Sequence, residues 1–144
     1  MNPTRIAISA FAALVAYLIV GGIFFFIPAM SAEFANYPSI YRTGDAANSV
    51  MAVGMLGIFL AIAAASAIFA RMHPAGAGVK EGIRFGVLLA VFQLGSFVLH
   101  NHMMLNIGWR LSVLQGIVYT AEWIVVGIVI SLVYRGRALA PDTR

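Results

Sequence analysis

The chain has 144 residues, of which 62% are hydrophobic and 10% are charged, so a soluble catalytic domain has no room beside its apolar segments. Its formal net charge is +4, but the basic residues are spread over the ends of those segments, which argues against nucleic-acid binding. The chain has no cysteine, which excludes disulfides, thiolate metal sites and cysteine nucleophiles.

Four long apolar segments occupy most of the chain. A bilayer core about 30 Å thick is crossed by roughly 20 apolar residues of helix. We expect transmembrane helices at about residues 6–27, 47–70, 82–101 and 110–134. Because short connections favour antiparallel neighbours, the sequence predicts an all-α polytopic membrane protein, with one four-helix antiparallel transmembrane bundle over residues 1–144.

The first helix is expected to end at Pro28, because proline cannot continue a helix through its backbone nitrogen. The following segment, to Asp45, is predicted to be a loop at the level of the lipid headgroups. Its aromatic residues Tyr37 and Tyr41 suit that interface.

Small residues recur along the second helix and open the third. Gly54, Gly57 and Ala61 are spaced so that they lie on one face, which predicts close approach by a neighbouring helix. The third helix begins with a GxxxG pattern formed by Gly82 and Gly86, which predicts tight packing there.

Polar side chains are predicted to form a buried track. Glu122 falls near the middle of the fourth helix, where a charged group costs about 2.5 to 3.5 kcal/mol on insertion scales. Gln115 and Tyr119 share its helix face, and we expect Gln93 of the third helix and Tyr17 of the first to join them. Two interpretations remain, which are hydrogen bonding between helices and a pathway for protons or a solute.

A second polar cluster closes the third helix, with His100 and His102 followed by Met103 and Met104. Imidazole and thioether ligands suit copper, and histidine also binds haem iron. Two histidines two positions apart diverge on a continuous helix, so joint ligation requires the helix to unwind. The alternative is that the histidines lie at the interface while the methionines fill packing gaps, so copper, haem and no cofactor all stay open.

The basic residues near helix ends are distributed unevenly. One side of the predicted bundle carries Arg5, Arg71, Lys80, Arg84, Arg135, Arg137 and Arg144, whereas the other carries Arg42 and Arg110. Cytoplasmic loops are enriched in Lys and Arg, so both termini are predicted to be cytoplasmic.

The second half of the chain resembles small bacterial four-helix inner-membrane proteins. The residues that carry the resemblance are Gly82 and Gly86, Asn101 or Asn106, Trp109-Arg110, Glu122-Trp123, Gly127 and Tyr134-Arg135. The resemblance implies residence in the bacterial inner membrane and implies no activity.

Three functions are compatible with these patterns. We favour a non-catalytic accessory or structural subunit of a larger membrane assembly, in contact with lipid and with other subunits or a second copy of itself. The alternatives are a small oligomeric transporter or channel that uses Glu122, and a copper-binding or haem-binding redox component that uses His100 and His102. No paired acid and base groups or nucleotide-binding loops indicate an enzyme.

Overall fold

The structure is a computed structural model that describes residues 2–42, 44–73 and 77–134. Every regular element in these residues is helical, and four spans are long and apolar enough to cross a membrane, which confirms the predicted all-α four-helix class. The elements are α1 (Pro3–Phe25), α2 (Pro28–Ala35), α3 (Gly44–Asn48), α4 (Met51–Met72), α5 (Val79–Gln93), η1 (Leu94–Leu99), α6 (His100–Met104) and α7 (Trp109–Val133).

Helix α1 begins earlier than expected because its first turn is capped. The Asn2 side chain accepts a hydrogen bond from the Arg5 backbone N–H at 3.2 Å, and Pro3 occupies the first helical position, where its missing N–H costs nothing. Pro28 follows α1 and also begins the short helix α2. The sequence predicted a loop in this segment.

The second predicted helix is divided in two. Gly44 begins α3 with a φ of 55°, a conformation that favours glycine, and the chain is not helical at Ser49 and Val50. Helix α4 then continues to Met72, two residues beyond the predicted end. Residues 74–76, and the basic residues Arg135, Arg137 and Arg144, lie outside the described residues.

The third span consists of α5, η1 and α6 in direct succession. At its start, the Glu81 carboxylate accepts a hydrogen bond from the Gly78 backbone N–H at 3.1 Å, which satisfies one donor of the first turn. The middle is a π-helical segment, η1, where the Ser96 hydroxyl donates to the Phe92 carbonyl at 2.6 Å. A π-helical turn contains more residues than an α-helical turn, so the residues after it point in different directions around the helix axis than they would in a continuous α-helix.

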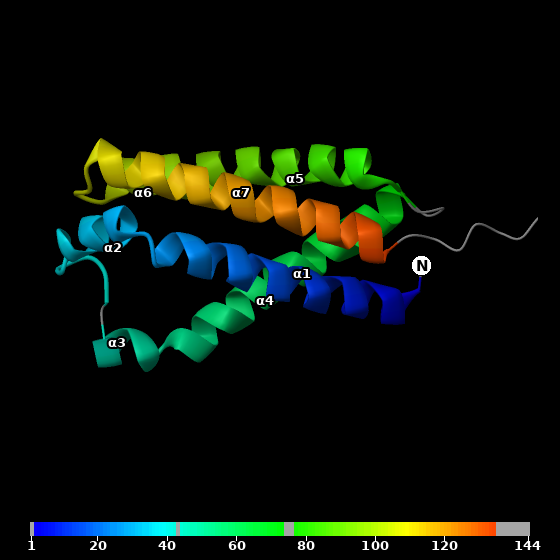
Figure 1. Cartoon of the computed structure of the whole chain (residues 1–144), viewed down its shortest axis with the longest axis horizontal. Coiled ribbons are helices and arrows are strands. Elements are labelled where there is room, and N and C mark those ends of the chain that lie inside the picture. The colour runs from blue at the N-terminus through cyan, green and yellow to red at the C-terminus, as the bar shows by residue number, and fades with distance from the viewer. Residues whose placement is uncertain (1, 43, 74–76, 135–144) are drawn as a thin grey trace, which may run out of the picture.

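Helix α7 lies between α1 and α5, and α4 packs mainly against α1 (Figure 1). The core lies toward the end of the bundle where α1 begins and α7 ends, which we call the terminal end. Its buried residues include Ala10 and Ala13 of α1, Ile62 and Phe69 of α4, and Ile130 of α7. Small residues on α1 allow α4 to approach, as packing in lipid requires.

The crossing of α5 and α7 brings the two backbones into contact. A Cβ on Gly86 would lie 2.6 Å from the Ile124 Cα, and one on Gly82 would lie 2.8 Å from the Gly127 carbonyl oxygen. The Ser131 hydroxyl also donates to the Gly78 carbonyl at 2.6 Å. Gly82 and Gly86 therefore lie in the tight contact that their spacing predicts.

The small-residue face of α4 is placed differently from the expectation. No atom of the described chain lies within 4 Å of a Cβ built on Gly54 or Gly57, and Ala61 is exposed. The reason is the path of the chain, because α4 runs obliquely and its first half diverges from α1 and α2 (Figure 1). Only its second half contributes buried residues to the core, so Gly54 and Gly57 have no neighbouring helix among the described residues.

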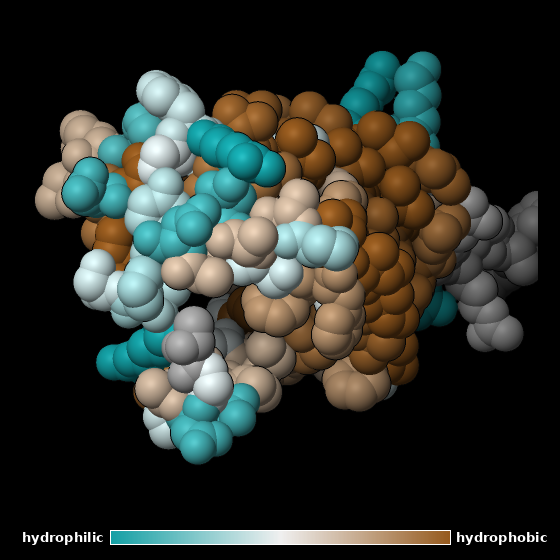
Figure 2. All heavy atoms as spheres, turned by 60° about the vertical axis from the view of Figure 1, so that its left-hand side comes forward, coloured by the Kyte–Doolittle hydropathy of each residue, from teal (hydrophilic) through white to brown (hydrophobic). Residues whose placement is uncertain are grey.

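Polar residues gather at the opposite end from the termini, which we call the long-loop end. Figure 2 shows hydrophilic residues concentrated there and hydrophobic residues covering the adjoining helices. This separation fits an apolar band in lipid that adjoins a hydrated end.

Candidate intramembrane site

A cavity of about 190 Å³ lies between α1, α2 and α7. Six of its ten lining residues have side chains without oxygen or nitrogen, and the other four carry a carboxyl, an amide or a phenol. The lining consists of Tyr17, Gly21, Phe24, Phe25, Met30, Phe34, Gln115, Val118, Tyr119 and Glu122. The cavity thus combines aromatic walls with a few polar groups, which is the usual character of a small-molecule site.

Glu122 is the most unusual group in this cavity. It is only 3% exposed, and its Oε2 has no hydrogen-bond partner among the described residues. Its Oε1 lies directly against Gly21 of α1, where any side chain would collide with it. The Tyr17 hydroxyl lies beside the same carboxyl. Gly21 therefore makes the space in which the Glu122 carboxyl is held.

Gln115 occupies the part of the cavity nearer the long-loop end. It is 2% exposed, and its Nε2 donates to the Tyr41 hydroxyl at 3.3 Å, while its Oε1 has no partner in the described chain. Gln115 precedes Glu122 by two helical turns, roughly 10 Å along the axis. The cavity therefore offers two buried acceptors at different depths.

Four members of the predicted polar track line this cavity, namely Tyr17, Gln115, Tyr119 and Glu122. Gln93, the fifth member, does not line the cavity and lies half-buried at the end of α5. Gln115 forms its hydrogen bond with Tyr41, although a contact with the third helix was expected. The reason is that α7 is central: one face meets α1 and carries the polar groups, whereas the face toward α5 carries Gly127.

The walls formed by Met30 and Phe34 could not be found from the sequence. Both residues belong to α2, a helix of eight residues within the segment predicted as a loop. The only signal was Pro28, which terminates one helix and is equally favoured at the first position of the next.

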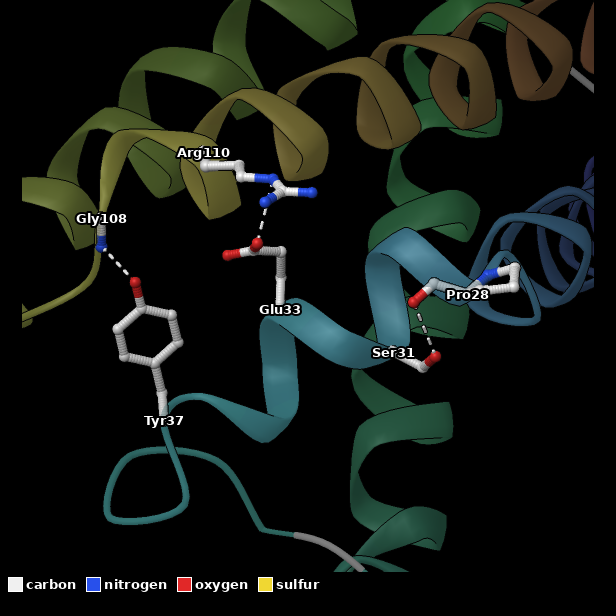
Figure 3. Close-up of polar contacts among 6 residues, drawn as sticks. All are labelled: Pro28, Ser31, Glu33, Tyr37, Gly108 and Arg110. Atoms are coloured by element: carbon white, nitrogen blue, oxygen red, sulfur yellow. Dashed lines mark hydrogen bonds and ion pairs between the residues drawn. The ribbon is translucent and has the colours of Figure 1, made fainter.

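Helix α2 and the loop after it are fastened to the start of α7 (Figure 3). The Arg110 Nε lies 3.0 Å from Glu33 Oε1, and the side chain of Glu33 is 8% exposed whereas that of Arg110 is 73% exposed. The Gly108 backbone N–H donates to the Tyr37 hydroxyl at 2.8 Å. These two contacts hold α2, which forms one wall of the cavity, against α7, the helix that carries Glu122.

The proposed metal ligands at the end of the third span are directed to different surroundings. His102 Nδ1 lies 3.0 Å from the Ser112 hydroxyl, and its ring is 3.8 Å from that of Trp109. His100, Met103 and Met104 are exposed. Within residues 2–42, 44–73 and 77–134, no group of three or more His, Cys, Asp or Glu side chains is arranged to hold a metal ion.

The fold and this site define a multi-pass integral membrane protein with an intramembrane carboxyl. No protein-family profile, curated protein or solved structure matches the chain.

Proposed function

We propose that this protein is a non-catalytic accessory subunit of a larger assembly in the bacterial inner membrane. The observation that carries the proposal is the unpartnered face of α4, formed by Gly54, Gly57 and Ala61. Glycine costs about 1 kcal/mol relative to alanine inside a helix, so two glycines facing lipid give no benefit to the isolated chain. Close approach by a transmembrane helix of another protein supplies that benefit.

The proposed contact is tested by photocrosslinking from two positions on α4 in native membranes. A photoreactive amino acid is placed at Ala61, on the small-residue face, and in a matched variant at Leu56, which is 57% exposed. The two positions point roughly 140° apart around the helix axis. A partner helix on the small-residue face is expected to give a discrete adduct from position 61 and none from position 56.

Mass spectrometry of the adduct decides between a subunit and its alternatives. An adduct with one defined membrane protein supports the proposal. An adduct of twice the mass of this chain, with no adduct to another protein, indicates that this face joins two copies of the chain and contradicts a contact with another subunit there. Equal labelling from both positions indicates that the face meets only lipid, which also contradicts the proposal.

A second candidate is a small transporter that moves a proton or solute through Glu122. It is favoured by the carboxyl oxygen that lies buried and unpartnered in a cavity, since ionisable groups at this depth commonly line transport pathways. Proteoliposomes that contain a pH-sensitive dye are expected to lose an imposed proton gradient faster with the wild type than with Glu122→Gln. Equal rates for the two proteins would remove a proton pathway.

A further inference from the structure

We propose that the Glu122 cavity binds a small organic amine, with its ammonium group against the carboxylate and its apolar body between the aromatic walls. The inference shares a site with the transporter candidate but requires only binding. A bound amine without flux would therefore support it while contradicting transport.

The charge of the lining favours a cationic ligand. None of the ten residues that line the cavity is Lys, Arg or His, so no described side chain of the lining supplies a positive charge to Glu122. A buried carboxylate without a counter-charge carries a large desolvation cost. A ligand that brings an ammonium group to the Glu122 carboxyl provides both a counter-charge and a hydrogen-bond donor for a group whose Oε2 has none among the described residues.

The composition of the cavity wall suits an organic cation better than a metal ion. Metal cations such as Ca²⁺ take six or more oxygen ligands at 2.3 to 2.6 Å, whereas only four of the ten residues that line this cavity carry a side-chain oxygen. An engineered cavity of about 150 Å³ accommodates benzene, so about 190 Å³ accommodates a ring with a short aminomethyl arm. Aromatic faces also attract an ammonium group.

Part of the cavity wall is exposed on the surface of the bundle. Phe25 lines the cavity and is 58% exposed on the surface of α1, so this part of the wall faces the lipid side of the helix. A ligand that dissolves in the bilayer meets the cavity there. Toward the long-loop end, α2 contributes Met30 and Phe34 to the wall and is held to α7 by an ion pair. The chemistry therefore favours an amine with an apolar body that partitions into membranes.

Calorimetric titration of the full-length protein in detergent tests the proposal with benzylamine as the probe. Benzyl alcohol and toluene have nearly the same shape without the charge. We expect saturable binding of benzylamine at least tenfold tighter than that of either neutral analogue. Equal affinity for all three would show that the cavity recognises shape alone and would overturn the proposal, as would the absence of saturable benzylamine binding.

Three variants locate the binding. Glu122→Gln keeps the size of the side chain and removes its charge, so benzylamine affinity should fall at least tenfold. Gly21→Ala places a methyl group against Glu122 Oε1 and should have a similar effect. Gly22→Ala is the matched control, because a Cβ there meets no atom of the described chain within 4 Å, and it should bind like the wild type.

The variants remain informative if one of them folds poorly. Each is first compared with the wild type by thermal unfolding and by elution as a single species in detergent. Unchanged benzylamine affinity in a folded Glu122→Gln protein would overturn the proposal. Should that variant fail to fold, Gly21→Ala against Gly22→Ala gives the same decision.

Discussion

At the scale of single residues, glycines decide where helices touch and where a functional group has space. Gly86 and Gly127 allow two backbones to meet, whereas Gly21 provides the space for a carboxyl oxygen. A Cβ added at Gly54 or Gly95 would meet no described atom within 4 Å beyond the backbone of its own helix, so the same residue type has different consequences at different positions. Spacing along one helix identifies candidates for contact, but it does not identify which candidates have a neighbour.

The α5 and α7 crossing yields a prediction for Gly86. In Gly86→Ala, the added methyl group would lie 2.6 Å from the Trp123 carbonyl oxygen, which is rigid backbone. Overpacking of this kind costs about 1 to 3 kcal/mol. When the protein is unfolded in mixed micelles with increasing SDS, Gly86→Ala should therefore unfold at a lower SDS fraction than the wild type.

The matched control for that experiment is Gly95→Ala. A Cβ at Gly95 meets no described atom within 4 Å, so the variant should unfold like the wild type or slightly later, because alanine is the better helix former. If both variants unfold at the same SDS fraction, the close approach of α5 and α7 is not present in the protein.

At the scale of elements, α2 is the segment that turns a polar helix face into an enclosed cavity. It contributes Met30 and Phe34 to the wall and is attached to α7 through the ion pair of Glu33 and Arg110. The two partners are not equivalent. Glu33 is buried and its carboxylate depends on Arg110, whereas Arg110 is mostly exposed and can be solvated by water.

This asymmetry predicts unequal effects of removing each partner. Arg110→Gln leaves a buried carboxylate without a counter-charge, so it should lower the melting temperature more than Glu33→Gln does. In the double variant, most of the loss caused by Arg110→Gln should be recovered. Thermal unfolding of the wild type, the two single variants and the double variant gives the interaction free energy between Glu33 and Arg110. A larger loss in Glu33→Gln than in Arg110→Gln would contradict the burial of Glu33.

At the scale of the whole molecule, the start of α1 and the end of α7 lie at the same end of a bundle with four candidate membrane spans (Figure 1). Of the described basic residues near helix ends, Arg5, Arg71, Lys80 and Arg84 lie at the terminal end, and Arg42 and Arg110 at the long-loop end. We propose on this basis that the terminal end is cytoplasmic.

Single-cysteine labelling tests this orientation, since the chain has no cysteine of its own. Asn106→Cys lies exposed in the loop before α7, and a membrane-impermeant maleimide should label it in spheroplasts with an intact inner membrane. Thr4→Cys, exposed near the start of α1, should be labelled only after the membrane is permeabilised. The reverse pattern would invert the orientation and place the Glu33 and Arg110 clamp on the cytoplasmic side.

The amino-acid sequence alone was sufficient for the all-helical class, the four spans and the polar face of the fourth helix. These depend on hydrophobic length and on the 3.6-residue period, both of which are local properties of a chain in lipid. Helix boundaries were shifted by a few residues where a cap or a proline acted, as at Asn2 and Pro28.

Only the tertiary structure decided which faces meet. It placed Glu122 against Gly21, gave Gln115 the Tyr41 hydroxyl as its partner, and left Gln93 outside the cavity. These outcomes depend on the central position of α7 and the oblique path of α4, which arise from backbone approach between residues distant in sequence. Periodicity within one helix carries no information about the direction of its neighbour, so such contacts emerge only when the helices pack.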